Sequence, residues 1–422
     1  MHHLLKIQVM DLLLPAYQKL YASLKSLEDF SKGQDLFDNI LCIDTFLSEY
    51  RNITFVLQKS IAHTEYFSIY EELRNKYFKT DSCSWLLEKR NEVLKEHPFR
   101  LEKQLQLTIY FSHEASIFVS ECYTIENEIT YSSLIDTIKE IISTIPSIEV
   151  FFSIEFIYRE QDSNMNMFSS IKNGIDTMFA FLVEFEKQIN AKPSKTRKKI
   201  IEKIKKLQFY STPKDMWFID DYVFYKEDNV FEKGLRMETL TPFETKIPYT
   251  SFCDVLHVNH NGNVIEETFE AFKKMHIIAF SKQKRITPTF LILNEDGLLS
   301  MCMYDSTIKT TTYRKINEIA TNIKLGFPIV AIFHVGEVLV YNNLKPFFKD
   351  YRKRSLSPDM EMLSFSIITK DTCSQYLFNS DSLLKQSTDC LYPQWTKVKL
   401  DDSISLMRPL IDAFKSTNRI EK

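Results

Sequence analysis

A chain of 422 residues is longer than one ordinary hydrophobic core supports, so its length predicts two or three domains. Its content of 44% hydrophobic and 26% charged residues is typical of a globular protein and excludes an intrinsically disordered one. The formal net charge of −3 excludes a general electrostatic attraction to nucleic acid or anionic lipid. Any binding of that kind must come from a local patch of positive charge.

The cysteines and the N-terminal residues bear on the compartment. Seven cysteines are scattered without a CxxC pair, which favours free thiols over a disulfide framework or a zinc ribbon. Asp11 and Pro15 interrupt the apolar run at the N-terminus, which does not fit a signal peptide. No stretch approaches the roughly 20 apolar residues that a membrane span needs. We therefore expect a cytoplasmic protein without a membrane segment.

Glycine is scarce, and this limits the chemistry. The chain has seven glycines, and none of them form GxGxxG, GxxxxGK[ST] or GxSxG. Those motifs need glycine because the backbone must approach a phosphate closely or turn sharply. The sequence therefore predicts neither a standard nucleotide-binding loop nor a hydrolase nucleophile elbow, and it indicates no cofactor.

Residues 1–103 are predicted to form an all-helical bundle. Their apolar residues recur at steps of three and four, most clearly from Gln34 to Ile61, which places them on one face of a helix. The predicted helices begin at Pro15, Gln34, Thr64 and Asp81 or Ser82, and the last one ends at Pro98.

Residues 104–191 are predicted to be an α+β segment. Strand-like alternation and helical periodicity follow one another, with strands at 105–111, 117–123 and 148–158 and helices at 131–143 and 165–189. The last of these helices is long and amphipathic, so it can pack back on the N-terminal bundle.

Residues 192–208 are predicted to be a basic linker. One interpretation is a patch that binds along the RNA phosphate backbone through Lys195, Arg197, Lys198 and Lys199. The alternative is a solvated linker and helix face with its isoleucines turned inward, which is the more common meaning of a charge run.

Residues 209–422 are predicted to form a C-terminal mixed α/β or α+β domain. The pattern places helices at 266–276, 312–325 and 403–416, hairpins at 289–304 and 329–341, and a strand at 361–369. The second hairpin is expected to turn at Gly336. The whole chain is therefore predicted to be an α+β multidomain protein.

One candidate catalytic constellation lies at the end of the bundle. Arg90 and His97 are seven residues apart, nearly two helical turns, so we expect both on one face of the fourth helix, with Asn91 beside them. A groove between two bundles would supply the water and partners that they need. The structural alternative is that Arg90 pairs with a carboxylate such as Glu49, while His97 caps the helix C-terminus.

This stretch resembles the HEPN superfamily, whose helical bundles often carry Arg-x4-6-His with Asn after the Arg. The resemblance covers residues up to about 100, and it implies a metal-independent endoribonuclease in which two protomers face their motifs across a dimer groove. His97 would transfer a proton, Arg90 would hold the phosphate, and Asn91 would orient it. The stretch also resembles an Arg-Asn…Lys-Glu-Gly-Pro pattern of bacterial proteins with glycine where this chain has His97, in which case the bundle is a non-catalytic scaffold.

Other candidate residues carry weaker signals. The Arg-Asn dipeptide recurs at Arg51 and Arg74 without a histidine at matching spacing. We expect both to form salt bridges within the bundle, although Arg51 could lend positive charge to the same RNA-binding groove. Asp254, His257 and His260 are metal-ligand types, but the surrounding Asn-His-Asn-Gly string favours a turn after a short strand over a metal site.

Two functional hypotheses follow. The first is an endoribonuclease-like effector, of the toxin or phage-defence kind, that cleaves RNA through an Arg/His site in a homodimer formed by the N-terminal bundle. The second is a non-catalytic HEPN-like scaffold that dimerises and binds a protein or nucleic-acid partner. In both, the C-terminal domain would recognise a partner or a trigger. Metal-dependent chemistry in the C-terminal domain is a third, weaker alternative.

Overall fold

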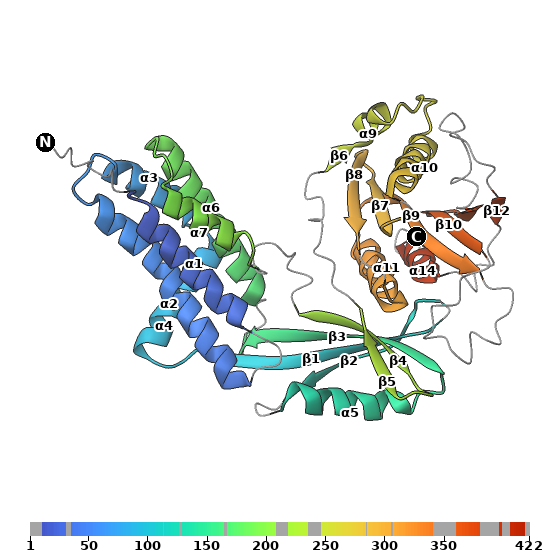
Figure 1. Ribbon diagram of the computed structural model, residues 1–422, viewed down its shortest axis with the longest axis horizontal. Coiled ribbons are helices and arrows are strands. Elements are labelled where there is room, and N and C mark those ends of the chain that lie inside the picture. Colours follow the sequence, from blue (N-terminus) through green and yellow to red (C-terminus); the bar gives the residue numbers. More distant parts are fainter. Residues whose placement is uncertain are drawn as a thin grey trace, which may run out of the picture. The chain divides into compact units, whose positions relative to one another are not determined.

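The computed structural model describes residues 11–30, 35–112, 114–125, 129–163, 167–207, 218–234, 246–283, 285–304, 307–340, 360–379, 396–398 and 406–417. The chain forms two compact units, and the α+β multidomain class is confirmed (Figure 1). The first unit comprises residues 1–107, 121–145 and 154–219, and the second comprises residues 108–120, 146–153 and 220–422. Neither unit is therefore one continuous stretch of sequence.

The first unit is mainly helical. Its helices are α1 (Leu14–Asp29), α2 (Leu36–Ile61), α3 (Phe67–Tyr77), α4 (Asp81–Lys95), α5 (Tyr131–Ser143), α6 (Met167–Gln188) and α7 (Lys195–Ile204). Helix α1 packs against α2 and α7, whereas α6 packs against α3 and α4. The predicted return of the long helix onto the bundle is therefore confirmed. Helix α7 lies inside the range predicted as a linker.

Local sequence explains where these helices begin. Pro15 occupies the first turn of α1, where its missing N–H leaves no helical hydrogen bond unmade. Asp35 caps α2 by accepting a hydrogen bond from the backbone N–H of Asp38 at 2.9 Å. Thr80 caps α4 by accepting from the N–H of Cys83 at 3.3 Å, so the cap precedes the predicted one by a residue.

A five-stranded sheet has the order β2-β1-β3-β4-β5. Its strands are β1 (Leu101–Tyr110), β2 (Ile117–Thr124), β3 (Glu149–Glu160), β4 (Ile219–Tyr225) and β5 (Val230–Lys233). Alternate residues of β1 are buried up to Ile109, the period of two from which this strand was predicted. The division between the units runs through β1, β2 and β3 and through the first residue of β4, so each of these strands contributes residues to both.

The second unit contains a seven-stranded sheet with the order β12-β11-β10-β9-β7-β8-β6. Its strands are β6 (Ile247–Pro248), β7 (Thr289–Asn294), β8 (Leu298–Met303), β9 (Ile329–Val340), β10 (Met360–Thr369), β11 (Cys373–Asn379) and β12 (Thr396–Val398). All its described strand pairs are antiparallel. Helices α9 (Tyr249–Val255), α10 (Val264–Gln283), α11 (Lys309–Lys324) and α14 (Arg408–Thr417) accompany it.

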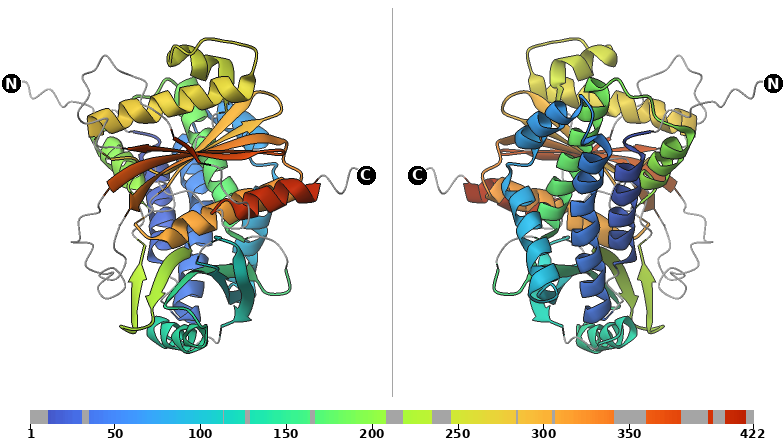
Figure 2. Two further views of the ribbon diagram at one scale, coloured as in Figure 1. Left: turned by 90° about the vertical axis from the view of Figure 1, so that its right-hand side faces the viewer. Right: turned by 90° about the vertical axis from the view of Figure 1, so that its left-hand side faces the viewer.

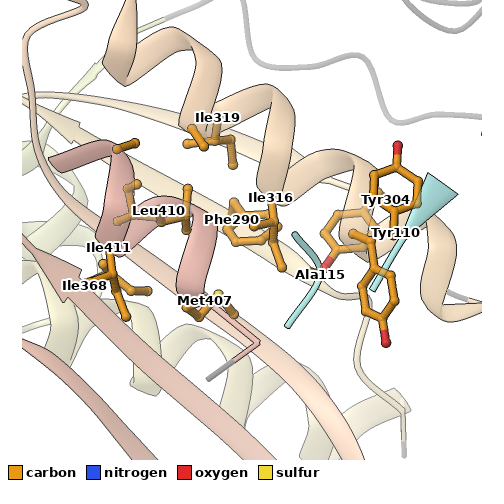
Figure 3. Packing of buried hydrophobic residues seen from close by; sticks show 14 of the residues in the cluster. Tyr110, Ala115, Phe290, Tyr304, Ile316, Ile319, Ile368, Met407, Leu410 and Ile411 are labelled. Carbon is orange, nitrogen blue, oxygen red and sulfur yellow. The ribbon is translucent and has the colours of Figure 1, made fainter. Parts of the chain in front are cut away.

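Helices cover both faces of this sheet. Helix α10 lies on one face, and α11 and α14 lie on the other (Figure 2). Successive residues of β9 accordingly belong to different hydrophobic clusters: Phe333 to the one that contains Phe272 of α10, and Ile332 to the one that contains Ile316 and Leu410 of α11 and α14 (Figure 3). Burial on both faces explains the continuous apolar runs at 290–293 in β7 and 329–333 in β9.

The predicted hairpin at 329–341 is wrong. Gly336 does not turn the chain, because it lies inside the continuous strand β9, opposite Ser364 of β10. Strand β9 is central in the sheet, with β10 on one side and β7 on the other. The valines Val335, Val338 and Val340 suit an extended strand. None of the described helices has the length and apolar character that crossing a membrane requires.

A buried ion pair in the second unit generates a stability prediction. The Asp221 carboxylate accepts hydrogen bonds from Nε and Nη2 of Arg314 at 2.9 Å each, and both side chains are at least nine-tenths buried. Asp221→Asn should lower the free energy of unfolding by about 3 kcal/mol, because it leaves a buried guanidinium less well compensated. Asp412→Asn at the exposed Arg408–Asp412 pair of the same unit should cost about 0.5 kcal/mol or less.

Thermal unfolding of the full chain, followed by calorimetry, measures both changes. Equal shifts in the melting temperature of the two variants would contradict the assigned role of the buried pair.

Candidate anion-binding site

The predicted Arg90–His97 face does not form. Helix α4 ends at Lys95, and Glu96 has non-helical dihedral angles of φ −124° and ψ −61°. His97 therefore lies beyond the helix, where its Nδ1 donates to the carbonyl of Pro98 at 3.0 Å. A separation of seven residues places two side chains on one face only while the helix continues, so the expected geometry is wrong.

His97 and Arg90 have different surroundings. His97 lies near Asp44 of α2. Burial raises the pKa of Asp44, and both the hydrogen bond from the backbone N–H of Phe99 and the charge of His97 oppose that rise. Arg90 donates from Nη1 to Oδ1 of the adjacent Asn91 at 3.1 Å. The alternative Arg90–Glu49 pair is also wrong, because Glu49 is 2.8 Å from Lys19 and no described carboxylate pairs with Arg90.

A pocket of about 260 Å³ lies beside these residues in the helical unit. Helices α2, α3, α4 and α6, with the segment that follows α3, supply its lining: Tyr50, Arg51, Thr54, Arg74, Asn75, Phe78, Lys79, Cys83, Ser84, Leu86, Leu87 and Met178. The lining contains three cations and, among these described residues, no carboxylate.

A close approach of helices forms the floor of the pocket. The Tyr50 hydroxyl of α2 donates to the carbonyl of Gly174 in α6 at 2.7 Å. A Cβ atom on Gly174 would lie 2.2 Å from Cδ1 of Leu86 in α4, so a larger residue there would require the Leu86 side chain to move. Tyr50, Leu86 and Met178 are all buried, which closes the pocket at its base.

Arg51 is the central cation of the pocket. Its side chain is half-buried, and its Nη1 donates to Oγ1 of Thr54 at 2.5 Å. Burial lowers the pKa of Arg51, and the positive charges of Arg74 and Arg90 lower it further. The Tyr70 hydroxyl opposes this shift only in part. The fold therefore concentrates positive charge here at an electrostatic cost.

Arg51 and Arg74 were expected to form bundle salt bridges, and this expectation is wrong. Within the part of the chain that the structure describes, neither they nor Lys79 pairs with a carboxylate. Several other cations of the same unit are paired: Lys19 with Glu49, Lys25 with Asp29, Lys172 with Asp176, and Lys89 with Glu92 and Glu160. Uncompensated charge at one pocket is what an anion-binding site needs.

The pocket is better equipped for binding than for proton transfer. Arginine and lysine supply charge-assisted donors, and Thr54, Asn75 and Ser84 add neutral polar groups. Burial raises the pKa of Tyr50 well above its usual value, so its hydroxyl stays protonated. The described lining contains no histidine, aspartate or glutamate that could exchange a proton near neutral pH.

The basic residues of the predicted linker divide into two groups. Arg197 is fully buried, with Nε 3.1 Å from Asp11 and Nη2 3.1 Å from Glu186. It cannot contact RNA from that position, which corrects the prediction for this residue. Lys195, Lys198 and Lys199 are exposed on α7 and stay candidate RNA contacts.

The Asp254–His260 region forms a clamp around histidine. The expected strand is wrong, because Asp254 lies in helix α9 and its Oδ1 is 3.1 Å from Nε2 of His260. On the other side, Nδ1 of His260 is 2.7 Å from Oε2 of the buried Glu267. His257 does not join them and has a positive φ of 52°. The described residues contain no group of three ligands able to hold a metal.

Comparison of the chain with protein-family models, with curated proteins and with solved structures found no match.

The clamp predicts a pH dependence of stability. Hydrogen bonds to Glu267 and then Asp254 raise the pKa of His260 above its ordinary 6.5. The resulting stabilisation is complete below the unfolded-state pKa and is lost as pH rises through the folded-state pKa. The lowered pKa of Glu267 acts in a separate acidic range. The melting temperature should therefore fall from about pH 6 to about pH 9, and His260→Gln should remove this component.

His63→Gln, at an exposed histidine of the other unit, serves as the control. Parallel melting curves for the wild type and His260→Gln over this pH range would contradict the clamp.

Proposed function

We propose that the N-terminal helical unit binds RNA and holds one of its phosphate groups in the pocket around Arg51. The observation that carries this proposal is the half-buried Arg51, which lies with Arg74 and Lys79 in a pocket without a described carboxylate. Phosphate contacts from arginine and lysine supply most of the affinity of proteins for nucleic acid. The resemblance to HEPN bundles favours RNA as the polymer.

Retention of RNA fits this geometry better than cleavage. A HEPN-like ribonuclease needs Arg90, Asn91 and His97 to face one reacting phosphate, whereas His97 lies past the end of α4 and does not line the pocket. The second hypothesis, a non-catalytic binding protein, is therefore the one that we propose. The exposed lysines of α7 offer further contacts along an RNA backbone.

Filter binding with a 5′-³²P-labelled single-stranded RNA tests this function. Arg51→Met should weaken binding about tenfold, because it removes a charge-assisted phosphate contact. It should also reduce the slope of log affinity against log salt by about one. Arg51→Lys, which keeps the charge, should retain part of the affinity.

Lys25→Met is the matched control, because it removes the same charge from a cation that Asp29 already compensates and that does not line the pocket. Equal affinity of wild type, Arg51→Met and Lys25→Met would overturn the proposal. Circular dichroism of each variant verifies the fold.

The ribonuclease hypothesis is tested on the same material. RNA incubated with the protein in EDTA should stay intact if the pocket only binds. Cleavage that survives EDTA and disappears in both Arg90→Ala and His97→Ala would contradict simple binding and support the metal-independent ribonuclease hypothesis. Light scattering with and without RNA measures whether the bundle forms the dimer that this chemistry requires.

A further inference from the structure

The size and closure of the pocket restrict what can enter it. Its volume of about 260 Å³ is below the roughly 300–1,000 Å³ of pockets for drug-sized ligands. Its base is closed by Tyr50, Leu86 and Met178, which are 7%, 1% and 1% exposed. Arg74, Asn75 and Lys79 form an exposed rim. Proteins that bind along a nucleic-acid strand instead use open grooves that take several nucleotides, so this pocket suits the end of a chain.

The charge of the pocket also favours the end of an RNA chain. Arg51, Arg74 and Lys79 bring three positive charges, and Arg90 lies close enough to Arg51 to repel it. An internal phosphodiester carries one negative charge, whereas a phosphate monoester carries about 1.5 to 2 near pH 7. A monoester therefore offsets more of the repulsion. It also offers three terminal oxygens to the guanidinium, ammonium and hydroxyl donors of the lining.

We infer that the pocket takes the terminal phosphate monoester of an RNA chain in preference to an internal phosphodiester. This inference rests on the proposed RNA binding and specifies which part of the RNA is held. Arg51 is the deepest charged donor, with Thr54 beside it, and Arg74 and Lys79 approach from the rim. Phe78 lines the same pocket, and aromatic side chains are the groups on which unpaired bases stack.

The closing experiment is a competition. Labelled RNA is displaced from the full chain by unlabelled strands of one sequence that end in a 5′-phosphate, a 3′-phosphate or hydroxyls only, and by inorganic phosphate. A phosphorylated strand should compete about tenfold more strongly than the hydroxyl strand, which corresponds to one additional charge-assisted contact. The 5′ and 3′ arms identify the end. Inorganic phosphate should compete weakly, because it lacks the base and the rest of the chain.

The preference should shrink from pH 7.5 to about pH 5, because the second pKa of a phosphate monoester is about 6. The titratable and charged groups that face the ligand are Tyr50 and Arg51 from α2, Arg74 and Lys79 from α3 and the segment after it, and Cys83 from α4, with Arg90 nearby. None is a carboxylate or an imidazole, the side chains with ordinary pKa values in this range.

Arg51→Met should abolish the preference, and Lys25→Met should leave it unchanged. Equal competition by phosphorylated and hydroxyl strands, with binding still weakened by Arg51→Met, would overturn this inference and leave the proposed RNA binding standing. A preference that persists in Arg51→Met would also overturn it, because the end would then bind elsewhere. Absence of any RNA binding would overturn both.

Discussion

The hydrogen bond from Tyr50 to the carbonyl of Gly174 joins α2 to α6 at the base of the pocket. It is made possible by the absence of a side chain at Gly174, which lets Leu86 of α4 pack directly over the α6 backbone. Three helices are fixed by this one contact region. The cations of the pocket lie close to this contact in the chain: Arg51 follows Tyr50 in α2, and Arg74 of α3 and Lys79 precede α4.

The fold tolerates an unfavourable charge arrangement above this floor. Like charges within a half-buried site repel, and desolvation adds to the cost. The same unit compensates its fully buried Arg197 with two carboxylates, so it has the means to neutralise a buried cation. Arg51, which has no paired carboxylate among the described residues, therefore differs from Arg197, which forms ion pairs with Asp11 and Glu186.

Helices and strands were predicted correctly where the spacing of apolar residues within the segment itself determines the structure. Helix α5 has the predicted bounds of 131–143, and the long helix, the strands β1 to β3 and the β7–β8 hairpin were all recognised from periodicity. The turn predicted at Gly336 was wrong because a single glycine in an apolar run is compatible with either a turn or a strand. Only the pairing of β9 with β10 and β7 shows that the chain is extended there.

The site was predicted only in part. Arg51 was linked to the candidate groove, but Arg74 and Lys79 come from a different helix region, and no spacing rule connects them to α2. The Arg-Asn dipeptide at 51, 74 and 90 was the one visible signal. It did not reveal that their charges would be left uncompensated, because compensation depends on which carboxylates the tertiary fold brings near. The position of His97 depended on two residues at a helix end, where boundaries are least certain from sequence.

The discontinuous second unit has a consequence for how the chain is made. Tyr110, Ala115 and Phe151 belong to a hydrophobic cluster whose other members lie between Val223 and Phe414 (Figure 3). At the usual ribosomal rate of about 5–20 residues per second, residues 220–422 take roughly 10–40 seconds to follow. During that interval the three early residues have no core to enter. Burial of these side chains in their native cluster therefore waits for synthesis of the C-terminal half of the chain.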